Sequence, residues 1–443
     1  MKNKLKAWCE MIKKSFDLFP FQSEVLNRVK DKNRVAFFLE MGLGKTFVGA
    51  EKMMQLGKRY NLVICQKSKL YDWLVHFFTN YDCYPYDLTK KSELNCFLKD
   101  NWWLDTQPKI GFINYELAWR RKELLNLEDF TLLLDESSLI QNRKAKQSKF
   151  VLRLNPTNVI LLSGTPTSGK YENLWSQLHL LGWSISEDTY NSQYVNWKKQ
   201  SIGWGLNSKI VKIVDKKQPY KNVDRLKDKM RQYGAVFMKS DEVLNLPEQI
   251  VTKIEVDVSK DYRSFCRKLI VEIDGKTLVG DTDLSKRLCL RQLCGQFSAE
   301  KLQAFKDLIQ STNDRMIVFY NFTDELNAMI HIIRELSKPF GVVNGEKKEL
   351  DPYDNEDNSV TFVQYQAGAM GLNLQKANKI IYFTLPDGRQ DLFDQSKKRI
   401  HRIGQKNTCF YYLLICRNSI EEEILETLHI RKEYTDKLFE EGE

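Results

Sequence analysis

The stretch LEMGLGKT, residues 39–46, decides how the first half of this chain folds. It follows the apolar run RVAFFLE (34–40) and precedes the helical pattern FVGAEKMMQLGK (47–58), which predicts the order strand, loop, helix. Gly42 and Gly44 let successive backbone N–H groups turn inward toward a phosphate, and the N-terminus of the following helix adds its partial positive charge. The stretch therefore predicts a phosphate site between a strand and a helix.

Two side chains of this loop are suited to a nucleotide and its metal ion. Lys45 can reach the β- and γ-phosphates, and the Thr46 hydroxyl is a ligand of the kind that Mg²⁺ takes. Leu39 departs from the strict loop pattern, which has glycine there, and a glycine-rich turn that contains Gly-Lys-Thr by coincidence is the alternative. The predicted ligands are ATP and Mg²⁺, bound by Met41, Gly42, Leu43, Gly44, Lys45 and Thr46.

The stretch LLLDESS (132–138) supplies the acidic groups that phosphate chemistry needs. Asp135 follows a strand and can hold Mg²⁺ directly or through water, while Glu136 can polarise the attacking water as a general base. Upstream, Gln22 in FPFQ (19–22) offers one amide donor and one acceptor, which suits the edge of adenine. A solvated strand end and a surface glutamine are the alternatives for these residues taken singly.

Short apolar runs with polar or glycine-rich ends recur in both halves of the chain. Such runs are typical of strands buried on both faces of a parallel sheet, and stretches of helical length separate them. We therefore predict an α/β protein with two doubly wound parallel-sheet domains. The predicted strands are 34–40, 61–66, 109–115, 130–136 and 158–164 in the first domain, and 315–321, 340–345, 359–365, 378–384 and 409–416 in the second.

The same patterns give domain boundaries. The first domain is expected over 1–182, followed by a helical, basic and aromatic insertion over 183–240. Residues 241–258 are interpreted as an extended linker, because Pro247 disfavours helix in the residues before it, and the second domain covers 259–443. The insertion contains Trp183, Trp197 and Trp204.

Composition indicates a polyanionic partner. The 443 residues carry a formal net charge of +10 and have a pI near 8.9, which suggests nucleic acid first and an acidic membrane surface second. Nine cysteines form no CxxC pair, and no apolar run approaches the roughly 20 residues that cross a bilayer. We therefore expect a soluble intracellular protein with no zinc site.

The stretch RIHRIGQ (399–405) places two arginines three residues apart. On a helix Arg399 and Arg402 would share one face. An arginine brought to a transferring phosphoryl group is worth roughly 10³–10⁵ in rate, so these two would complete the site when the domains close around ATP. A basic helix face in contact with solvent is the alternative.

Taken in order, these motifs resemble the motor of a superfamily 2 helicase, and specifically the Snf2 family. The phrases that carry the resemblance are EMGLGKT (40–46), ICQKSKLYDW (64–73), DESS (135–138), SGTP (163–166), VLNLP (243–247), CLRQLCGQF (289–297), GLNL (371–374) and RIHRIGQ. The resemblance implies two RecA-like domains in tandem with an ATP cleft between them. It also implies a DNA-dependent ATPase that translocates on duplex or branched DNA.

The resemblance also implies roles for particular residues. Lys45, Asp135, Glu136, Arg399 and Arg402 would be catalytic, and Gln22 would read adenine. Ser163 and Thr165 would couple nucleotide state to DNA grip, and Gly371 and Gln395 would line the cleft from the second domain. Loops after strands would bind DNA phosphates without reading sequence, through Lys67, Ser68, Asn114, Tyr115, Ser148, Lys149, Asn321, Phe322, Ala367 and Gly368.

Departures from the family pattern keep other functions open. DESS replaces DEAH or DEGH, so Ser138 stands where a coupling histidine is usual, and the phrases AGA (367–369) and DGRQ (387–390) are also altered. These changes suggest, as one rival, an ATP-gated DNA-binding module with weak hydrolysis. A strand-separating helicase is another, although no hairpin wedge is identifiable. An RNA-dependent ATPase is a third. The insertion is either a subdomain with a tryptophan core or an element that contacts the duplex.

The lysine-rich chain with little beyond the motor resembles Snf2 members carried by bacteriophages and mobile elements. This implies a role in phage DNA replication or recombination in the bacterial host cytoplasm, as a monomer, with a phage replication protein or a nuclease as a possible partner and no membrane association.

Overall fold

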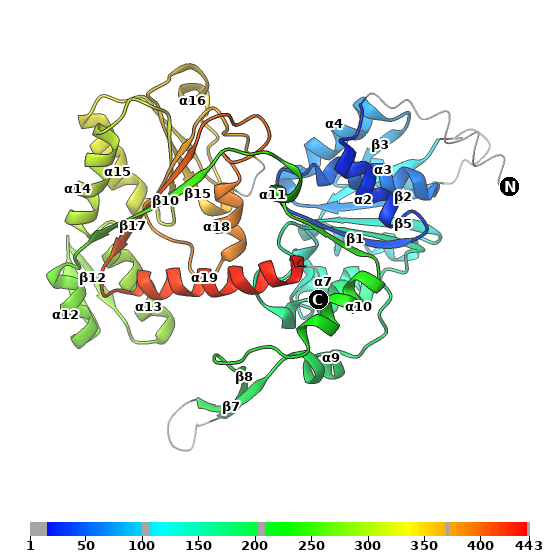
Figure 1. The fold of residues 1–443 in the computed structure, drawn as a ribbon, viewed down its shortest axis with the longest axis horizontal. Coiled ribbons are helices and arrows are strands. Elements are labelled where there is room, and N and C mark those ends of the chain that lie inside the picture. Colours follow the sequence, from blue (N-terminus) through cyan, green and yellow to red (C-terminus); the bar gives the residue numbers. More distant parts are fainter. Residues whose placement is uncertain (1–15, 100–106, 203–208, 369–371, 441–443) are drawn as a thin grey trace. The chain divides into compact units, whose positions relative to one another are not determined.

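The structure is a computed structural model that describes residues 16–99, 107–202, 209–368 and 372–440. The chain divides into two compact units. The first unit comprises Met1–Val243 together with Tyr434–Glu443, and the second comprises Leu244–Glu433. Figure 1 shows the chain coloured from blue at the N-terminus to red at the C-terminus.

The first unit is built on a seven-stranded sheet in the order β3-β4-β2-β5-β6-β1-β9, and every neighbouring pair is parallel. Its central strands are almost completely buried, which explains why they read as uninterrupted apolar runs. The five strands predicted in this half are confirmed. The strands are β1 (Arg34–Leu39), β2 (Tyr60–Cys65), β3 (Tyr84–Asp87), β4 (Lys109–Asn114), β5 (Phe130–Asp135), β6 (Asn158–Leu162) and β9 (Ala235–Met238).

Helices separate these strands, as a doubly wound sheet requires. Helix α3 packs on β6, β1 and β5, and α4 packs on β3 and β4. Among the described residues, the helices of this unit are α2 (Pro20–Arg28), α3 (Lys45–Leu56), α4 (Leu70–Asn80), α5 (Lys91–Leu98), α6 (Tyr115–Ala118), α7 (Lys146–Val151), α8 (Trp175–Leu180), α9 (Glu187–Tyr194), α10 (Val223–Gln232) and α11 (Ser240–Val243). Four 3-10 turns, η1 (Lys67–Lys69), η2 (Lys122–Asn126), η3 (Ser137–Ile140) and η4 (Tyr171–Asn173), lie between them.

The segment 183–240 is not the purely helical insertion that the sequence suggested. Besides α9 and α10 it contains an antiparallel hairpin of β7 (Trp197–Ile202) and β8 (Lys209–Val214), and it includes β9, a strand of the main sheet. Trp183 does belong to the core, since its ring stacks on Tyr233 at 5.7 Å. Trp204 lies outside the described residues.

The second unit is built on a six-stranded sheet in the order β10-β17-β16-β13-β15-β14, again entirely parallel. The five strands predicted in this half are confirmed. The strands are β10 (Gln249–Val256), β13 (Met316–Tyr320), β14 (Phe340–Val343), β15 (Val360–Gln364), β16 (Lys379–Tyr382) and β17 (Cys409–Cys416). A separate antiparallel hairpin pairs β11 (Ile270–Ile273) with β12 (Lys276–Val279).

Part of the expected linker 241–258 is a strand. Residues 249–256 are extended, as the position of Pro247 indicated, but they form β10 and pair with β17 from Gln249↔Cys409 to Val256↔Cys416. Most of β10 is exposed because it is the edge of its sheet. The pairing partner lies some 160 residues later in the chain, so local sequence gives no sign of it.

Helices of the second unit surround its sheet. They are α12 (Lys260–Lys268), α13 (Asp283–Cys294), α14 (Ala299–Gln310), α15 (Thr323–Glu335), α16 (Asp351–Asn355), α17 (Tyr365–Gly368), α18 (Gln390–Lys397) and α19 (Ile420–Phe439), the last residues of which belong to the first unit. A buried ion pair joins α14 to α19, where Lys301 Nζ donates to both carboxylate oxygens of Glu421 at 2.6 and 2.5 Å. Both units thus have the predicted parallel α/β fold.

No helix among the described residues is long and apolar enough to cross a membrane.

Candidate nucleotide site

The phosphate loop has the backbone that its glycines allow. β1 ends at Leu39, α3 begins at Lys45, and between them Gly42 and Gly44 adopt φ of 90° and 70°. A side chain at Gly44 would also collide with its surroundings, because a Cβ there would lie 2.3 Å from the Nε2 atom of Gln22. Both the backbone conformation and the close approach therefore require glycine at this position.

Lys45 lies at the mouth of this loop. Its Nζ donates a hydrogen bond to the Leu39 carbonyl oxygen at 3.0 Å and approaches the Glu40 carbonyl oxygen at 3.5 Å. The loop that carries SGTP comes close on the other side, since a Cβ on Gly164 would lie 3.3 Å from the same Nζ. The ammonium is thus held by carbonyl oxygens at the carboxyl end of β1, where ligands of parallel sheets bind.

Gln22 connects the start of α2 to the phosphate loop. The side chain is 3% exposed, its Oε1 accepts from the Phe19 amide at 3.0 Å, and its Nε2 donates to the Leu43 carbonyl at 3.0 Å. The amide that was predicted to face adenine therefore contacts the loop itself. A glutamine is needed here because the two contacts use one donor and one acceptor.

Asp135 ends β5 in a partly enclosed position. The indole Nε1 of Trp73 donates to its Oδ2 at 2.8 Å, and the Tyr115 hydroxyl donates to its backbone carbonyl at 2.9 Å. Burial raises the pKa of the Asp135 carboxyl, while the Trp73 hydrogen bond and the positive charge of Lys45 act in the opposite direction. These two contacts favour the ionised form, which is the form that binds a metal ion.

Glu136 follows in a left-handed backbone conformation, with φ of 53° and ψ of 60°. This conformation is uncommon for a residue other than glycine, and such strain is typical of functional positions. The Ser163 hydroxyl donates to Glu136 Oε2 at 3.4 Å and accepts from the Thr165 amide at 3.1 Å. One buried hydroxyl thus joins the acidic motif to the SGTP loop.

A second connection between these motifs passes through Gln177 of α8. The Ser137 hydroxyl donates to Gln177 Oε1 at 2.7 Å, and Gln177 Nε2 donates to the Pro166 carbonyl at 2.7 Å. All of these groups are buried. In addition, the Thr165 hydroxyl is buried and has no hydrogen-bond partner among the described residues. The acidic motif and the SGTP loop are therefore joined by short, buried contacts.

The side chains present fit a nucleotide with its Mg²⁺. The donor set is a hydroxyl and a carboxylate, Thr46 and Asp135, which are hard oxygen ligands of the kind Mg²⁺ prefers. The backbone of the phosphate loop turns between β1 and α3 at Gly42 and Gly44, and α3 directs its N-terminus toward this loop. Since β1, β5 and β6 are parallel, Lys45, Asp135 and Glu136 all follow strands whose carboxyl ends meet at one edge of the sheet.

The two arginines of the second unit are not on a helix, contrary to the prediction. α18 ends at Lys397, and residues 398–404 form turns. Arg399 is buried and its Nη1 lies 3.5 Å from the Leu372 carbonyl oxygen, whereas Arg402 is half-buried, and burial lowers its pKa. The turn is anchored by His401, which contacts the Pro247 carbonyl at 2.9 Å, so tertiary contacts replace the last helical turn.

Gln395 is buried within α18, and Gly371 lies outside the described residues.

The residues of the first unit that were predicted to contact nucleic acid form an exposed group and a buried group. Lys67, Ser68 and Lys149 are exposed after β2 and within α7. Asn114, Tyr115 and Ser148 are buried, and Asn114 donates to Glu116 Oε2 at 2.6 Å while Tyr115 supports Asp135. Asn114 and Tyr115 are thus held by contacts within the unit, and Ser148 is completely buried. Only the exposed members can contact a ligand as they stand.

In the second unit, Asn321 and Phe322 follow β13 and are half-buried. Asn321 donates to the Thr384 hydroxyl at 2.9 Å, and the Arg291 guanidinium lies 5.0 Å from the centre of the Phe322 ring. Ala367 and Gly368 end α17. A pocket of about 160 Å³ opens here. Its lining includes Arg291, Tyr320, Asn321, Gln364, Gln366 and Arg389.

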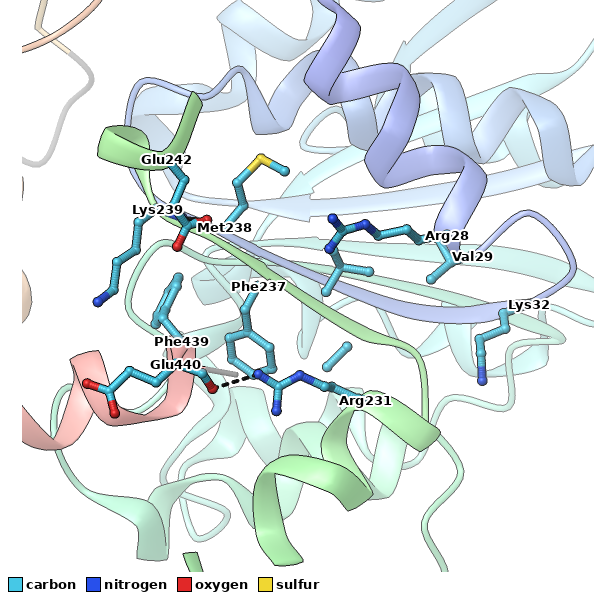
Figure 2. Close-up of a pocket in the computed structure, with 12 residues that line it drawn as sticks. Arg28, Val29, Lys32, Arg231, Phe237, Met238, Lys239, Glu242, Phe439 and Glu440 are labelled. Atoms are coloured by element: carbon cyan, nitrogen blue, oxygen red, sulfur yellow. Dashed lines mark hydrogen bonds between the residues drawn. The ribbon is translucent and has the colours of Figure 1, made fainter. Parts of the chain in front are cut away.

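A larger pocket in the first unit lies beside the edge strand β9. It measures about 430 Å³, and Figure 2 shows Phe237 and Phe439 side by side in it, with Arg231 bonded to the Glu440 carbonyl at 2.8 Å. Arg28, Lys32 and Lys239 also line it. No residue of the phosphate loop is among those that line this pocket, so it is distinct from the nucleotide site.

Comparison with known families decides the assignment. Residues 25–303 match the family of the SNF2-related domain, and residues 300–404 match the helicase conserved C-terminal domain. The chain belongs to the SNF2-related family. The resemblance seen in the motifs is thereby confirmed at the level of the family.

Individual relatives of this SNF2-related protein are distant. It is 25% identical over 456 residues to the mouse SWI/SNF-related matrix-associated actin-dependent regulator of chromatin subfamily A member 1, covering 91% of this chain and 41% of the relative. It is 24% identical over 355 residues to YwqA of Bacillus subtilis, whose name describes a candidate ATP-dependent helicase or translocase, covering 72% and 36%. The chain thus spans about two fifths of the length of these relatives.

Among solved structures, the SWI2/SNF2 ATPase core of Sulfolobus solfataricus, determined in complex with dsDNA, aligns with a TM-score of 0.46 and 21% identity over 96% of this chain and 94% of that one.

Two residues that contact the candidate site of this SNF2-related chain were not predicted from its sequence. Trp73 was noticed only as the end of the phrase ICQKSKLYDW, and its contact with Asp135 spans 62 residues. Gln177 lies in a helix with no motif around it. The position of Trp73 near the start of a helix, among charged and aromatic residues, is only a weak indication of a role in the site. The sequence around Gln177 gives no indication of one.

Proposed function

We propose that the chain is a motor that hydrolyses ATP in response to duplex DNA. The observation that carries this proposal is the meeting of Lys45, Asp135 and Glu136 at the carboxyl edge of one parallel sheet. Membership of the SNF2-related family and the basic net charge of +10 support a nucleic-acid partner.

In this proposal each residue of the first unit has one task. Lys45 and the loop amides bind the phosphates, and Gln22 binds the adenine edge. Thr46 and Asp135 hold Mg²⁺, which when bound supplies charge neutralisation to the phosphates. Glu136 orients the attacking water and accepts its proton, for which its carboxylate must be ionised.

The second unit supplies positive charge in this proposal. Arg399 and Arg402 stabilise the charge that develops on the equatorial oxygens of the transferring phosphoryl group, and Gly371 and Gln395 assist nucleotide binding. Arg402 is the stronger candidate for direct contact because its guanidinium is only half-buried, whereas Arg399 is enclosed by its own unit.

Ser163 and Thr165 carry the coupling. Because the Ser163 hydroxyl binds both Glu136 and the Thr165 amide, a change at the γ-phosphate alters the position of the SGTP loop. The exposed residues Lys67, Ser68 and Lys149 contact DNA phosphates in this proposal, together with Asn321 and Phe322 and the end of α17. Phosphate contacts of this kind make binding independent of sequence and sensitive to salt.

The test is ATP turnover without nucleic acid and with single-stranded DNA, duplex DNA, forked DNA or duplex RNA, each at two salt concentrations. Stimulation by duplex DNA that weakens as salt increases is the expected result. Equal turnover with every polymer would contradict the motor, and preferential stimulation by duplex RNA would identify the other polymer as its track.

We also infer a role in replication or recombination of bacteriophage DNA, supported only by the lysine-rich composition and the form of the motifs. This role predicts stronger stimulation by forked or branched DNA than by linear duplex, and no additional stimulation by nucleosomes. A preference for nucleosomes over bare DNA would contradict it.

A further inference from the structure

The hairpin of β7 and β8 is an arm of the first unit. Its two strands pair with each other over Trp197↔Val214 to Ile202↔Lys209 and belong to neither main sheet. Figure 1 shows it extending from the region of α9 and α10, beyond the body of its unit. A two-stranded ribbon is marginally stable by itself, so its attachment has to be firm.

The base of the arm is indeed well anchored. Asn196 and Asp215 flank the two strands, and the Asp215 amide donates to the Asn196 carbonyl at 2.8 Å, while the Asn196 amide donates to the Pro219 carbonyl at 2.8 Å. Tyr220, just beyond, stacks on the buried Tyr171 at 4.3 Å. The arm is therefore presented from a rigid support.

The two faces of the arm differ in charge. Residues directly opposite in an antiparallel pair share a face, so Trp197, Lys199, Lys212 and Ile210 lie on one face. Lys199 is directly opposite Lys212, and both are exposed. Within the described part of the chain, neither lysine makes an ion pair. We call this the Lys199–Lys212 face.

On the opposite face of the same hairpin, a lysine is paired with a carboxylate. Lys198 lies there, opposite Ile213, and its Nζ is 2.9 Å from the Asp215 carboxylate. The positive charge of Lys198 is thus balanced by a neighbouring acid, whereas neither Lys199 nor Lys212 is paired with a carboxylate of the described residues.

This face does not stabilise the fold. Like charges directly opposite one another destabilise a strand pair, and its apolar members remain in solvent, with Ile210 73% and Trp197 39% exposed. A pair of facing lysines between exposed apolar side chains is, however, well suited to phosphate oxygens and sugar surface. A two-stranded ribbon also has the width that the major groove of a duplex admits.

We propose that the Lys199–Lys212 face binds the backbone of duplex DNA, with the two lysines on phosphates and Trp197 against the adjacent groove wall. This inference rests on the proposed function, because it assigns a further contact to the same DNA-driven motor. The hairpin that carries this face was not predicted from the sequence.

The first experiment compares single lysine variants on the two faces. Binding of the full chain to a fluorescently labelled blunt duplex is measured by anisotropy over a series of salt concentrations, for Lys212→Ala and for the matched Lys198→Ala. Loss of one phosphate contact should flatten the slope of log K against log salt by about 0.9. The flattening is expected for Lys212→Ala and not for Lys198→Ala.

A charge reversal separates binding from folding. Lys212→Glu places a carboxylate opposite Lys199 and turns a repelling pair into an attracting one, so the melting temperature should stay or rise while duplex affinity falls. A purely structural role for Lys212 would change both in the same direction. Equal duplex affinity and salt slope in the wild type and Lys212→Glu would overturn the proposal.

The same titrations distinguish this proposal from the function on which it rests. If the wild-type chain binds duplex DNA and is stimulated by it, but the Lys212 variants behave as wild type, only the arm is wrongly assigned. If the wild-type chain shows neither binding nor stimulation, the proposed motor itself fails. A loss of affinity confined to single-stranded DNA would overturn the duplex assignment of this face.

Discussion

The indole Nε1 of Trp73 donates a hydrogen bond of 2.8 Å to Oδ2 of Asp135. A residue of α4, 62 positions earlier in the chain, thus sets the charge and orientation of the carboxylate that is proposed to hold Mg²⁺. Burial raises the pKa of this carboxyl, and the indole is the leading influence against that rise. In the proposed site Trp73 is therefore a positioning residue, which orients the Asp135 carboxylate and favours its ionised form.

Replacing this indole gives the first prediction. Trp73→Phe keeps most of the ring volume and removes the donor, so the pKa of Asp135 should rise further, and the acid limb of the turnover–pH profile should move to higher pH. The measurement is kcat against pH at several Mg²⁺ concentrations. The control is Trp119→Phe, whose ring lies against Arg120 and Lys146. An unchanged acid limb in Trp73→Phe would contradict the role given to the indole.

The second prediction concerns the general base. Glu136→Gln preserves the shape and the unusual backbone position but cannot accept a proton, so kcat should fall by about 10²–10⁴ while ATP binding is retained. ATP affinity measured by a fluorescent analogue, together with turnover, checks both parts. Glu123→Gln, at an exposed position, serves as the control. Normal turnover in Glu136→Gln would favour the ATP-gated binding module instead.

The third prediction distinguishes the two arginines by burial. Arg402→Ala should lower turnover by roughly 10³ or more without a fall in melting temperature. Arg399→Ala should lower both, because Arg399 is enclosed and lies against the Leu372 carbonyl. Turnover and thermal unfolding are measured on each variant, with the exposed Arg267→Ala as control. Full turnover in Arg402→Ala would remove Arg402 from the site.

The fourth prediction tests coupling. Ser163→Ala removes the hydroxyl that joins Glu136 to the Thr165 amide, so stimulation by duplex DNA should fall more than turnover without DNA. Leaving the Thr165 amide without its buried acceptor should also cost about 1–3 kcal/mol of stability. The ratio of stimulated to basal turnover is the measurement, and an equal loss in both states would indicate damage to catalysis rather than to coupling.

The fifth prediction concerns a buried acid of the second unit. Glu325 is completely buried, its Oε2 accepts from the Asn321 and Phe322 amides at 2.9 and 3.1 Å, and burial raises its pKa from 4.5 to about 7. Between these values the folded chain binds more protons than the unfolded chain, so stability must fall as pH rises from about 4.5 to 7.

The size of that fall is of the order of 3 kcal/mol. Glu325→Gln cannot ionise and should lose this component of the pH dependence. Chemical unfolding of both forms at pH values on either side of the transition provides the comparison. Parallel stability–pH curves for the two forms would show that the Glu325 carboxyl stays ionised in the folded chain.

Much of the fold was predictable because the central strands are buried on both faces. Their apolar runs are visible without any knowledge of their partners, and ten of them were placed correctly. β3 was missed because YPYD contains a proline and lies at the edge of its sheet, where polar residues and proline are tolerated. β10 was assigned to a linker because its membership of the sheet depends only on the distant β17.

The hairpin of β7 and β8 was not predictable either, for a reason that differs from those for β3 and β10. None of the side chains described over 197–201 and 210–214 is fully buried, and without a buried face the alternation that marks a strand is weak. Among the site residues, the phosphate loop and the acidic pair were readable because their chemistry lies in consecutive positions. Trp73 and Gln177 act across 62 and 40 residues of sequence, and only the folded chain brings them to their partners.

In the proposed function, the contact between Gln22 and Leu43 links recognition of the base to the phosphate loop. Nε2 of Gln22 already donates to the Leu43 carbonyl, and it lies where a side chain on Gly44 would be. The Nε2 amide carries two N–H groups, so a base can accept from the second one while the first still donates to the Leu43 carbonyl. A matching base would then be held by the same side chain that fixes the phosphate loop, so the base and the loop would share one anchor.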